Sequence, residues 1–223
     1  MTPDPFALIW RSLPLFFQGV VVTVELFLLA SLLSVLLGIF FGMVTCKKLH
    51  CLFLSRFIKG VTFALRAVPF FVQLLIIYFV VPELCGFQLE PFPASVLALG
   101  LCSSGYVAQF IRGAIDTLPT SHWETASTLG YGKRQTLFHI VFPQAFRAAL
   151  PALNNEFESL LKSTAIASSI GMLELTRIGM NVVSRELEPV PIYLALAFFY
   201  GGLSLALNWM TKRIEKRFHY VNY

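Results

Sequence analysis

The ionisable residues Glu156, Glu158 and Lys162 lie within an apolar stretch between residues 146 and 172. A charged side chain costs about 2.5–3.5 kcal/mol at the centre of a membrane helix, so charges in such a stretch point to a function. Glu158 and Lys162 are four residues apart with the acid first, the favourable order for an ion pair on one helix face. We expect this candidate pair to neutralise itself.

Glu156 lies on a different helix face, because two residues correspond to a rotation of roughly 200°. It lines up instead with Ser159 and Ser163, which gives a stripe of one carboxylate and two hydroxyls. An acid on such a stripe is best tolerated where it faces a water-filled path. Gln73, which follows Pro69 in an earlier apolar stretch, is a candidate neighbour. The candidates for lining a pathway are therefore Gln73, Glu156, Ser159 and Ser163.

A second polar feature is the segment of residues 120–143, which stands between two apolar stretches. Ser121 and Glu124 are three residues apart, the spacing of a capping box at the start of a helix. Gly130 follows about two turns later, where a short helix would end. The sequence therefore predicts a short helix over residues 121–130, displayed outside the bilayer.

The elements that must position these residues are membrane-spanning helices. Of the 223 residues, 57% are hydrophobic and only 13% are charged, which places the chain in the polytopic membrane class. We expect an all-α polytopic membrane protein with five transmembrane helices, forming a single domain of residues 1–223. The predicted spans cover roughly residues 15–44, 61–81, 92–115, 146–172 and 192–210.

Lys and Arg are distributed unevenly among the loops between these spans. They are uncompensated after the first span, in the segment 120–143 and in the carboxyl-terminal tail, whereas the other loops are acidic or balanced. Because positive loops stay in the cytoplasm, the amino terminus is predicted outside and the carboxyl terminus inside. The amino-terminal segment has no basic region followed by a small-residue cleavage site, so we expect no cleaved signal peptide.

Two further features predict how the spans are shaped and packed. Gly38 and Gly42 form a GxxxG motif, which favours close helix packing, either inside this chain or between subunits. Pro69 lies within the second predicted span, where it should kink or interrupt the helix.

Several classes of function lack the residues that they need. The segment Gly130-Tyr131-Gly132-Lys133 does not have the GxxxxGK[ST] spacing of a phosphate loop, so we do not expect this chain to hydrolyse ATP. Cys46 and Cys51 lie near His50 without metal-ligand spacing, and we expect inert thiols and no metal. No serine, histidine and acid stand at one depth for catalysis. The net charge of +5 comes from residues beside apolar segments and indicates a membrane surface, not a nucleic acid.

The residues E-T-A-S-T-L-G at 124–130, followed by F-P at 142–143, resemble the EAA loop of permease subunits in bacterial ATP-binding-cassette importers. Nearly the whole chain is similar to the subfamily that imports polar amino acids. The other segments that match this subfamily are residues 65–69 with Gln73, and residues 106–113, 143–145, 149–151, 155–156 and 160–164.

The chain departs from the family pattern at a few positions. Thr125 replaces the first Ala of EAA and keeps a small side chain, and Ala67-Val68 replace Gly-Thr in the second-span motif. Gln109 stands where the subfamily commonly has Glu. Glu158 stands where an apolar residue is usual, which adds charge near Glu156.

The resemblance implies a MetI-like type I importer fold in the bacterial cytoplasmic (inner) membrane, with helix 121–130 as a cytoplasmic coupling helix. It implies two ATPase subunits, a second permease (an identical copy or a paired homologue) and a periplasmic or lipid-anchored solute-binding protein, all in contact with membrane lipid. ATP and Mg would be bound by the partner ATPase and no cofactor by this chain. The residues implied to couple to the ATPase are Ser121, Glu124, Thr125, Ala126 and Gly130.

The implied function is that of a non-catalytic transport subunit that moves a polar, including a basic, amino acid inward, driven by ATP hydrolysis on another subunit. Glu156, with Glu158 nearby, favours a basic or broadly polar substrate, because a carboxylate suits an α-ammonium group and a cationic side chain equally. One alternative is an ion-coupled secondary transporter, which should show an inverted repeat. The other is a structural subunit of a different membrane complex, in which residues 120–143 would be only a linker.

Overall fold

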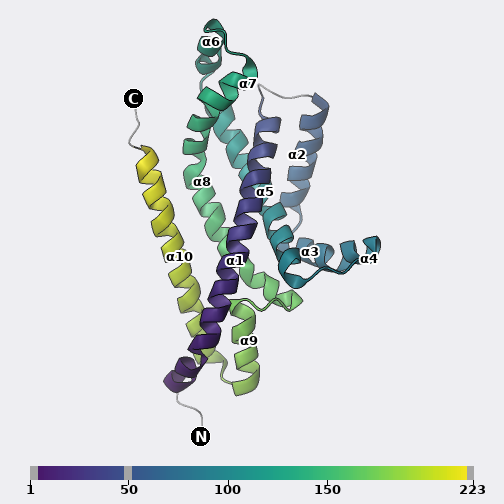
Figure 1. Cartoon of the computed structure of the whole chain (residues 1–223), viewed down its shortest axis with the longest axis vertical. Helices are drawn as coiled ribbons and strands as arrows, with labels where there is room; N and C mark the ends of the chain where they lie inside the picture. Colours follow the sequence, from purple (N-terminus) through teal and green to yellow (C-terminus); the bar gives the residue numbers. More distant parts are fainter. Residues whose placement is uncertain (1–4, 48–51, 220–223) are drawn as a thin grey trace. The chain divides into compact units, whose positions relative to one another are not determined.

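The computed structural model describes residues 5–47 and 52–219, and all regular elements in these ranges are helical (Figure 1). They form two compact units. Within the described residues, the first unit contains residues 5–31, 70–99 and 158–209, and the second contains residues 32–47, 52–69, 100–157 and 210–219. His50 and Cys51, considered above for metal-ligand spacing, lie outside the described residues.

The helical elements, in chain order, are α1 (Pro5–Thr45), α2 (Leu52–Ala67), α3 (Phe70–Leu75), the π-helical turn η1 (Ile76–Val80), α4 (Val81–Cys85), α5 (Pro91–Thr117), α6 (Ser121–Thr128), α7 (Lys133–Thr136), the π-helical turn η2 (Leu137–Val141), α8 (Phe142–Ser163), the 3₁₀ helix η3 (Thr164–Ile170), α9 (Leu175–Glu186) and α10 (Pro189–His219).

Three of these helices, α1, α5 and α10, are long and apolar enough to cross a membrane. A fourth span is possible if two consecutive helical segments, Phe53–Ala67 and Phe70–Cys85, cross the membrane as one bent unit, because together they are long and apolar enough. The chain breaks between them at Pro69, where α2 ends at Ala67 and α3 begins at Phe70. Proline lacks an amide hydrogen and disfavours helical geometry in the preceding residue, so the predicted interruption at Pro69 is confirmed. The five spans and their bounds stay a prediction.

In the second unit, the later half of α1 packs closely against α5. A Cβ atom on Gly38 would lie 2.4 Å from Val107 Cγ1, and one on Gly42 would lie 2.9 Å from Ile111 Cβ. The glycines therefore let the two backbones approach, as small residues do between membrane helices. The GxxxG motif acts inside this chain.

The core of the second unit is built from stripes of apolar residues spaced four apart on α5 and along η2 and α8. This spacing places the side chains on one helical face, so that the facing helices bury one continuous surface. Cys46, the residue after α1, is also fully buried there. The buried members are Cys46, Val107, Ile111, Ile115, Leu137, Val141, Ala145, Ala149 and Leu153.

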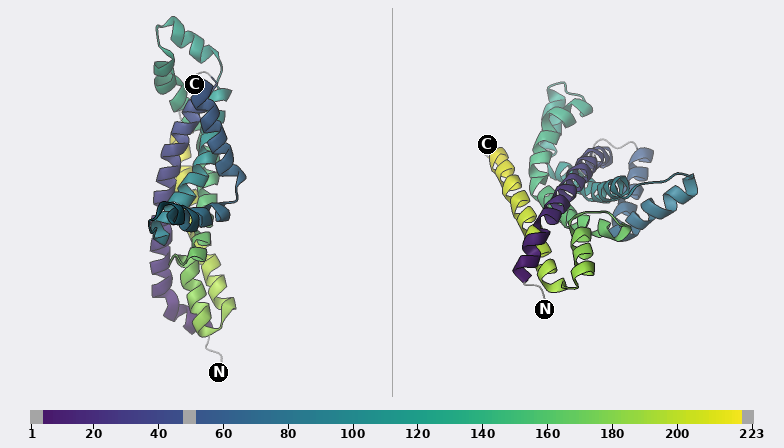
Figure 2. Two further views of the ribbon diagram at one scale, coloured as in Figure 1. Left: turned by 90° about the vertical axis from the view of Figure 1, so that its right-hand side faces the viewer. Right: turned by 60° about the horizontal axis from the view of Figure 1, so that its bottom comes forward.

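In the first unit, the beginning of α1 packs with α9 and the start of α10, which lie side by side in Figure 2. Glu174 caps α9: its carboxylate accepts the amide hydrogens of Thr176 (2.9 Å) and Arg177 (2.8 Å) and the hydroxyl of Tyr200 (2.8 Å). Its side chain is fully buried. Burial raises the pKa of Glu174 above its ordinary value, although these hydrogen bonds act in the opposite direction.

The close approach of α1 to α5 leads to a stability prediction. Gly38→Ala should lower the free energy of unfolding by about 1–3 kcal/mol, because the added methyl group overlaps Val107. Gly60→Ala on α2 is the matched control: nothing lies within 4 Å of the added carbon, and alanine favours a helix. Thermal unfolding of the detergent-purified variants measures both effects, and equal stability of the two variants would contradict the packing role.

Candidate functional site

The short helix α6 joins the end of α5 to α7 and α8 in the second unit (Figures 1 and 2). It starts at Ser121, and the capping residue is Thr120, whose backbone is already helical (φ −61°, ψ −26°) and whose side chain makes no capping bond. The predicted capping box between Ser121 and Glu124 is therefore wrong. Ser121 lies inside the helix, and the amide of Glu124 donates to the Thr120 carbonyl oxygen at 3.1 Å.

The predicted stop of this helix at Gly130 is confirmed. Gly130 has φ +82°, a left-handed conformation that glycine adopts without strain. Its amide donates to the Ser127 carbonyl oxygen (3.0 Å), and the Tyr131 amide donates to the Ala126 carbonyl oxygen (2.9 Å). This pair of hydrogen bonds is the Schellman arrangement, which satisfies the last carbonyl groups of the helix.

The two faces of α6 differ. Ala126 is 1% exposed, and Trp123 packs against the core of the second unit. The exposed residues of α6 and of the position after it, which we call the α6 surface, are Ser121, Glu124, Thr125, Ser127, Thr128 and Leu129. Ala126 was predicted among the residues that couple to the ATPase, and its side chain is buried within its own chain. The coupling role of these residues stays a prediction.

Glu156 belongs to a buried hydrogen-bond network of the second unit. Ser103 on α5 donates to Glu156 Oε1 at 2.7 Å, and Ser34 on α1 donates to the Ser103 hydroxyl oxygen at 2.9 Å. Both serine side chains are buried. From the sequence, Glu156 was grouped with Ser159 and Ser163, and its partner Ser103 was not predicted. The signal for its partners was a small polar residue inside each of two apolar helices.

The other predicted pathway residues belong to the first unit. Ser159 is exposed, and the Ser163 hydroxyl donates to the Ser159 carbonyl oxygen at 2.9 Å. Gln73 is buried on α3, which contacts η3. Because Glu156 belongs to the other unit, its predicted juxtaposition with Gln73 stays a prediction.

The candidate ion pair between Glu158 and Lys162 is present. Lys162 Nζ lies 2.6 Å from Glu158 Oε1, and the side chains are 60% and 27% exposed, respectively. Asn208 on α10 donates to the second carboxylate oxygen of Glu158 at 3.2 Å, a contact that the sequence did not predict. An ion pair this exposed contributes little to stability.

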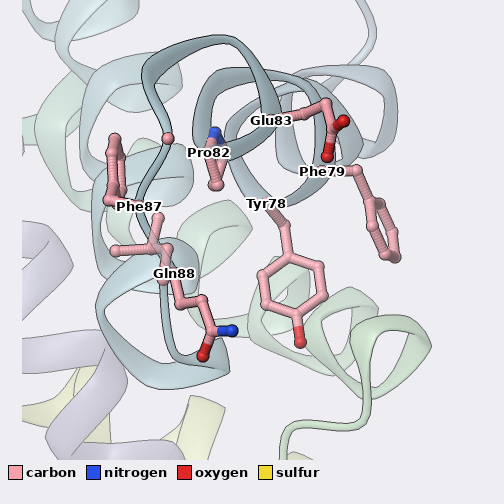
Figure 3. A pocket seen from close by; sticks show the side chains of 8 residues that line it. Tyr78, Phe79, Pro82, Glu83, Phe87 and Gln88 are labelled. Atoms are coloured by element: carbon pink, nitrogen blue, oxygen red, sulfur yellow. The ribbon is translucent and has the colours of Figure 1, made fainter.

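A pocket of about 700 Å³ lies along the segment that contains the end of η1, α4 and the following turn (Figure 3). Gly86 turns the chain after α4 with φ +71°. The side chains of Tyr78 and Gln88 extend in the same direction in Figure 3, and Glu83 is the acid of the lining. The Tyr78 and Phe79 rings pack edge to face with centroids 4.7 Å apart.

Several long apolar helices, an outward polar helix, and a carboxylate on α8 that accepts from a buried hydroxyl are the features expected of a multi-pass membrane transport protein. The chain belongs to the family of binding-protein-dependent transport system inner membrane components, whose model matches residues 34–220. Members of this family are non-catalytic membrane subunits of transport systems. Because the chain belongs to this family, both alternatives considered above, the secondary transporter and the structural subunit of a different complex, are disfavoured.

Two curated relatives align with almost the whole chain. The L-cystine transport system permease protein TcyB of Bacillus subtilis (strain 168) is 33% identical over 219 residues, covering 97% of this chain and 92% of the relative. The glutamine transport system permease protein GlnP of Escherichia coli (strain K12) is 27% identical over 216 residues, covering 94% and 95%.

Solved structures share the fold. A chain in the crystal structure of an amino acid ABC transporter with histidines superposes with a TM-score of 0.86 at 32% identity, covering 97% of this chain and 100% of that one. A chain of the MetNI methionine ABC transporter in an inward-facing conformation gives 0.80 at 16% identity, over 93% and 98%. The fold is thus the all-helical MetI-like fold of ABC permeases, and such a permease works with ATPase subunits and a permease partner.

The serine network leads to a second prediction. Ser103→Ala should lower the free energy of unfolding by about 1–3 kcal/mol, because it leaves a partly buried carboxylate without its donor. Ser104→Ala is the matched control, since the buried Ser104 hydroxyl donates within α5 to the Leu101 carbonyl oxygen. Thermal unfolding of these two variants, of Glu156→Ala and of Ser103→Ala/Glu156→Ala includes a double-mutant cycle for the pair of Ser103 and Glu156. Equal losses for the two serines, together with additivity in the cycle, would contradict the network.

Proposed function

We propose that this chain is the permease subunit of an importer that moves a polar amino acid, basic ones included, into the cytoplasm, driven by ATP hydrolysis on a separate subunit. The observation that carries the proposal is the likeness over nearly the full chain to permeases named for cystine, glutamine and arginine transport. Each of these solutes carries an α-ammonium group and an α-carboxylate. ATP and Mg belong to the partner ATPase in this proposal, and this chain binds no cofactor.

The proposed topology has five spans, with the amino terminus outside and the carboxyl terminus inside. The distribution of Lys and Arg supports it. The helix α8 is counted as a span although it carries charges: its 22 residues reach about 33 Å, and Glu156 is satisfied by hydroxyls of neighbouring helices. The α6 surface then faces the cytoplasm and the ATPase. The pocket of residues 78–89 faces outward, toward a periplasmic or lipid-anchored binding protein.

The core of the second unit supports α6 as the coupling helix. Trp123 packs against the same apolar cluster that contains residues of α5, η2 and α8. A push on the α6 surface is therefore transmitted to the helix that carries Glu156. Binding of ATP would favour the state in which the two ATPases are closed, and the permease pair would follow as a shift of population toward its outward-open form.

Glu156 is the proposed contact for the substrate. Ser103 occupies one carboxylate oxygen, Oε1, and the side chain is only partly buried. An ionised carboxylate has several acceptor sites, so Oε2 is available for an ammonium group. The hydroxyls of Ser34 and Ser103 orient the carboxylate, and Gln73, Ser159 and Ser163 are proposed to line the same pathway.

Coupling is tested by two glycines of one turn. Gly130→Val forces a β-branched residue into a left-handed conformation at a cost of roughly 1–2 kcal/mol or more, which should distort the end of α6. Gly132→Ala is the control, because its φ of −71° suits alanine. We expect Gly130→Val, and also Glu124→Arg on the α6 surface, to insert normally but to lose uptake and co-purification with the ATPase. Normal uptake in both variants would overturn the coupling role.

The substrate contact is tested by changing charge without changing shape. Glu156→Gln keeps an acceptor for Ser103 and removes the negative charge, so substrate affinity should fall about ten- to hundredfold, the value of a hydrogen bond to a charged group. Glu158→Gln is the matched variant on the same helix and should have a smaller effect. Uptake kinetics of an amino acid in reconstituted vesicles provides the measurement. Unchanged affinity and rate in Glu156→Gln would show that the assignment is wrong.

A further inference from the structure

A small basic pocket lies in the second unit, where α2 runs beside α5 and the end of α1 (Figure 1). Its volume is about 170 Å³. Lys59 and Arg66, which are seven residues apart and thus on one face of α2, enter its lining together with Arg112 from α5. The pocket is distinct from the Glu156 network and from the α6 surface.

The positive charge of this pocket is not compensated by acids. Among residues 5–47 and 52–219, the ion pairs of Arg11 and Arg185 with Glu186 and of Lys162 with Glu158 involve none of the three cations of this pocket. Asp116, one turn beyond Arg112, forms no ion pair with it and accepts the backbone amide of Lys47 at 3.0 Å. Three cations therefore converge on one small space without a counter-ion from the described chain. Such a site attracts an anion.

Arg66 is held in place by neutral groups. Its Nε donates to the Thr62 carbonyl oxygen at 3.1 Å, and its Nη1 donates to Gln109 Oε1. Gly105 on α5 lies beneath the Arg66 stem: a Cβ atom there would lie 3.1 Å from Arg66 Cγ and 3.2 Å from the Thr62 carbonyl oxygen. These contacts orient the guanidinium without neutralising it.

The size and donor geometry suit a phosphate group. A water molecule takes about 30 Å³ of liquid, so the pocket has room for the five heavy atoms of a phosphate. The planar guanidinium groups of Arg66 and Arg112 match phosphate oxygens in pairs, and the Lys59 ammonium adds a point charge. We propose that this α2–α5 pocket binds a phosphate group, carried either by an anionic lipid headgroup or by a free anion.

The position of the pocket favours contact with the inner leaflet, an argument that rests on the proposed topology. Thr45 at the end of α1 contributes to the lining, and the end of α5 leads into α6, so the pocket lies toward the cytoplasmic side. Basic pockets between membrane helices on the cytoplasmic side bind the headgroups of anionic lipids. Phe53, Phe57 and Phe63 are exposed on α2, which supplies an apolar surface for acyl chains.

The test uses the purified full-length permease and measures binding, not uptake, so its failure is distinguishable from failure of the proposed transport function. Native mass spectrometry would compare retention of phosphatidylglycerol with that of phosphatidylcholine. Arg66→Gln and Arg112→Gln should each lower phosphatidylglycerol retention about fivefold, the equivalent of about 1 kcal/mol for one basic residue at a membrane surface. Lys216→Gln, an equal charge change at an exposed site on α10, should have little effect.

Gln109→Glu keeps the side-chain shape and places a carboxylate on Arg66, so it should lower retention without removing a cation. A second arm measures thermal protection by inorganic phosphate in lipid-free detergent. Protection equal to that by phosphatidylglycerol supports the site with a free anion as its ligand, and protection by the lipid alone supports the headgroup. Protection by neither, or equal retention in Arg112→Gln and Lys216→Gln, would overturn the proposal.

Discussion

The close approach of α1 to α5 is the contact on which the second unit depends. Gly38 and Gly42 remove the side chains that would keep the two helices apart, and Val107 and Ile111 fill the space. Ser34 stands one turn before Gly38, and Ser103 stands one turn before Val107. The same approach therefore brings the two serine hydroxyls to 2.9 Å and sets up the donor for Glu156. Packing and polar chemistry share one interface.

Lipid offers no hydrogen bonds, so every polar group on these helices needs a partner within the protein or in a hydrated space. The chain meets this constraint differently in its two units. In the second unit, Glu156 accepts a hydrogen bond from the Ser103 hydroxyl. In the first unit, Glu158 forms an ion pair with Lys162 and accepts a hydrogen bond from Asn208. The hydrogen-bond donor to Glu156 is a neutral hydroxyl and the partners of Glu158 include a cation, which is why Glu156 is the proposed substrate contact.

In the proposed function, the outward helix α6 connects this packed core to another protein. Its inner face is fixed by Ala126 and Trp123, and its end is fixed by the left-handed Gly130. Its outer face is left polar and exposed. A helix anchored this firmly moves together with its core, which is the property that a coupling element between an ATPase and a permease requires.

The sequence by itself determined what depends on neighbours along the chain: apolar helices, the interruption at Pro69, the helix stop at Gly130 and the ion pair of Glu158 with Lys162. These features follow from local backbone geometry and from spacing on one helix. The motif residues also led to the family. Only the tertiary structure decided that Ser103, itself bonded to Ser34, donates a hydrogen bond to Glu156. It also decided that the side chain of Ala126 is buried and that Thr120 occupies the N-cap position of α6. Contacts between helices depend on how each helix is rotated and how far it is shifted against its neighbour, and these quantities are set by side chains distant in the sequence.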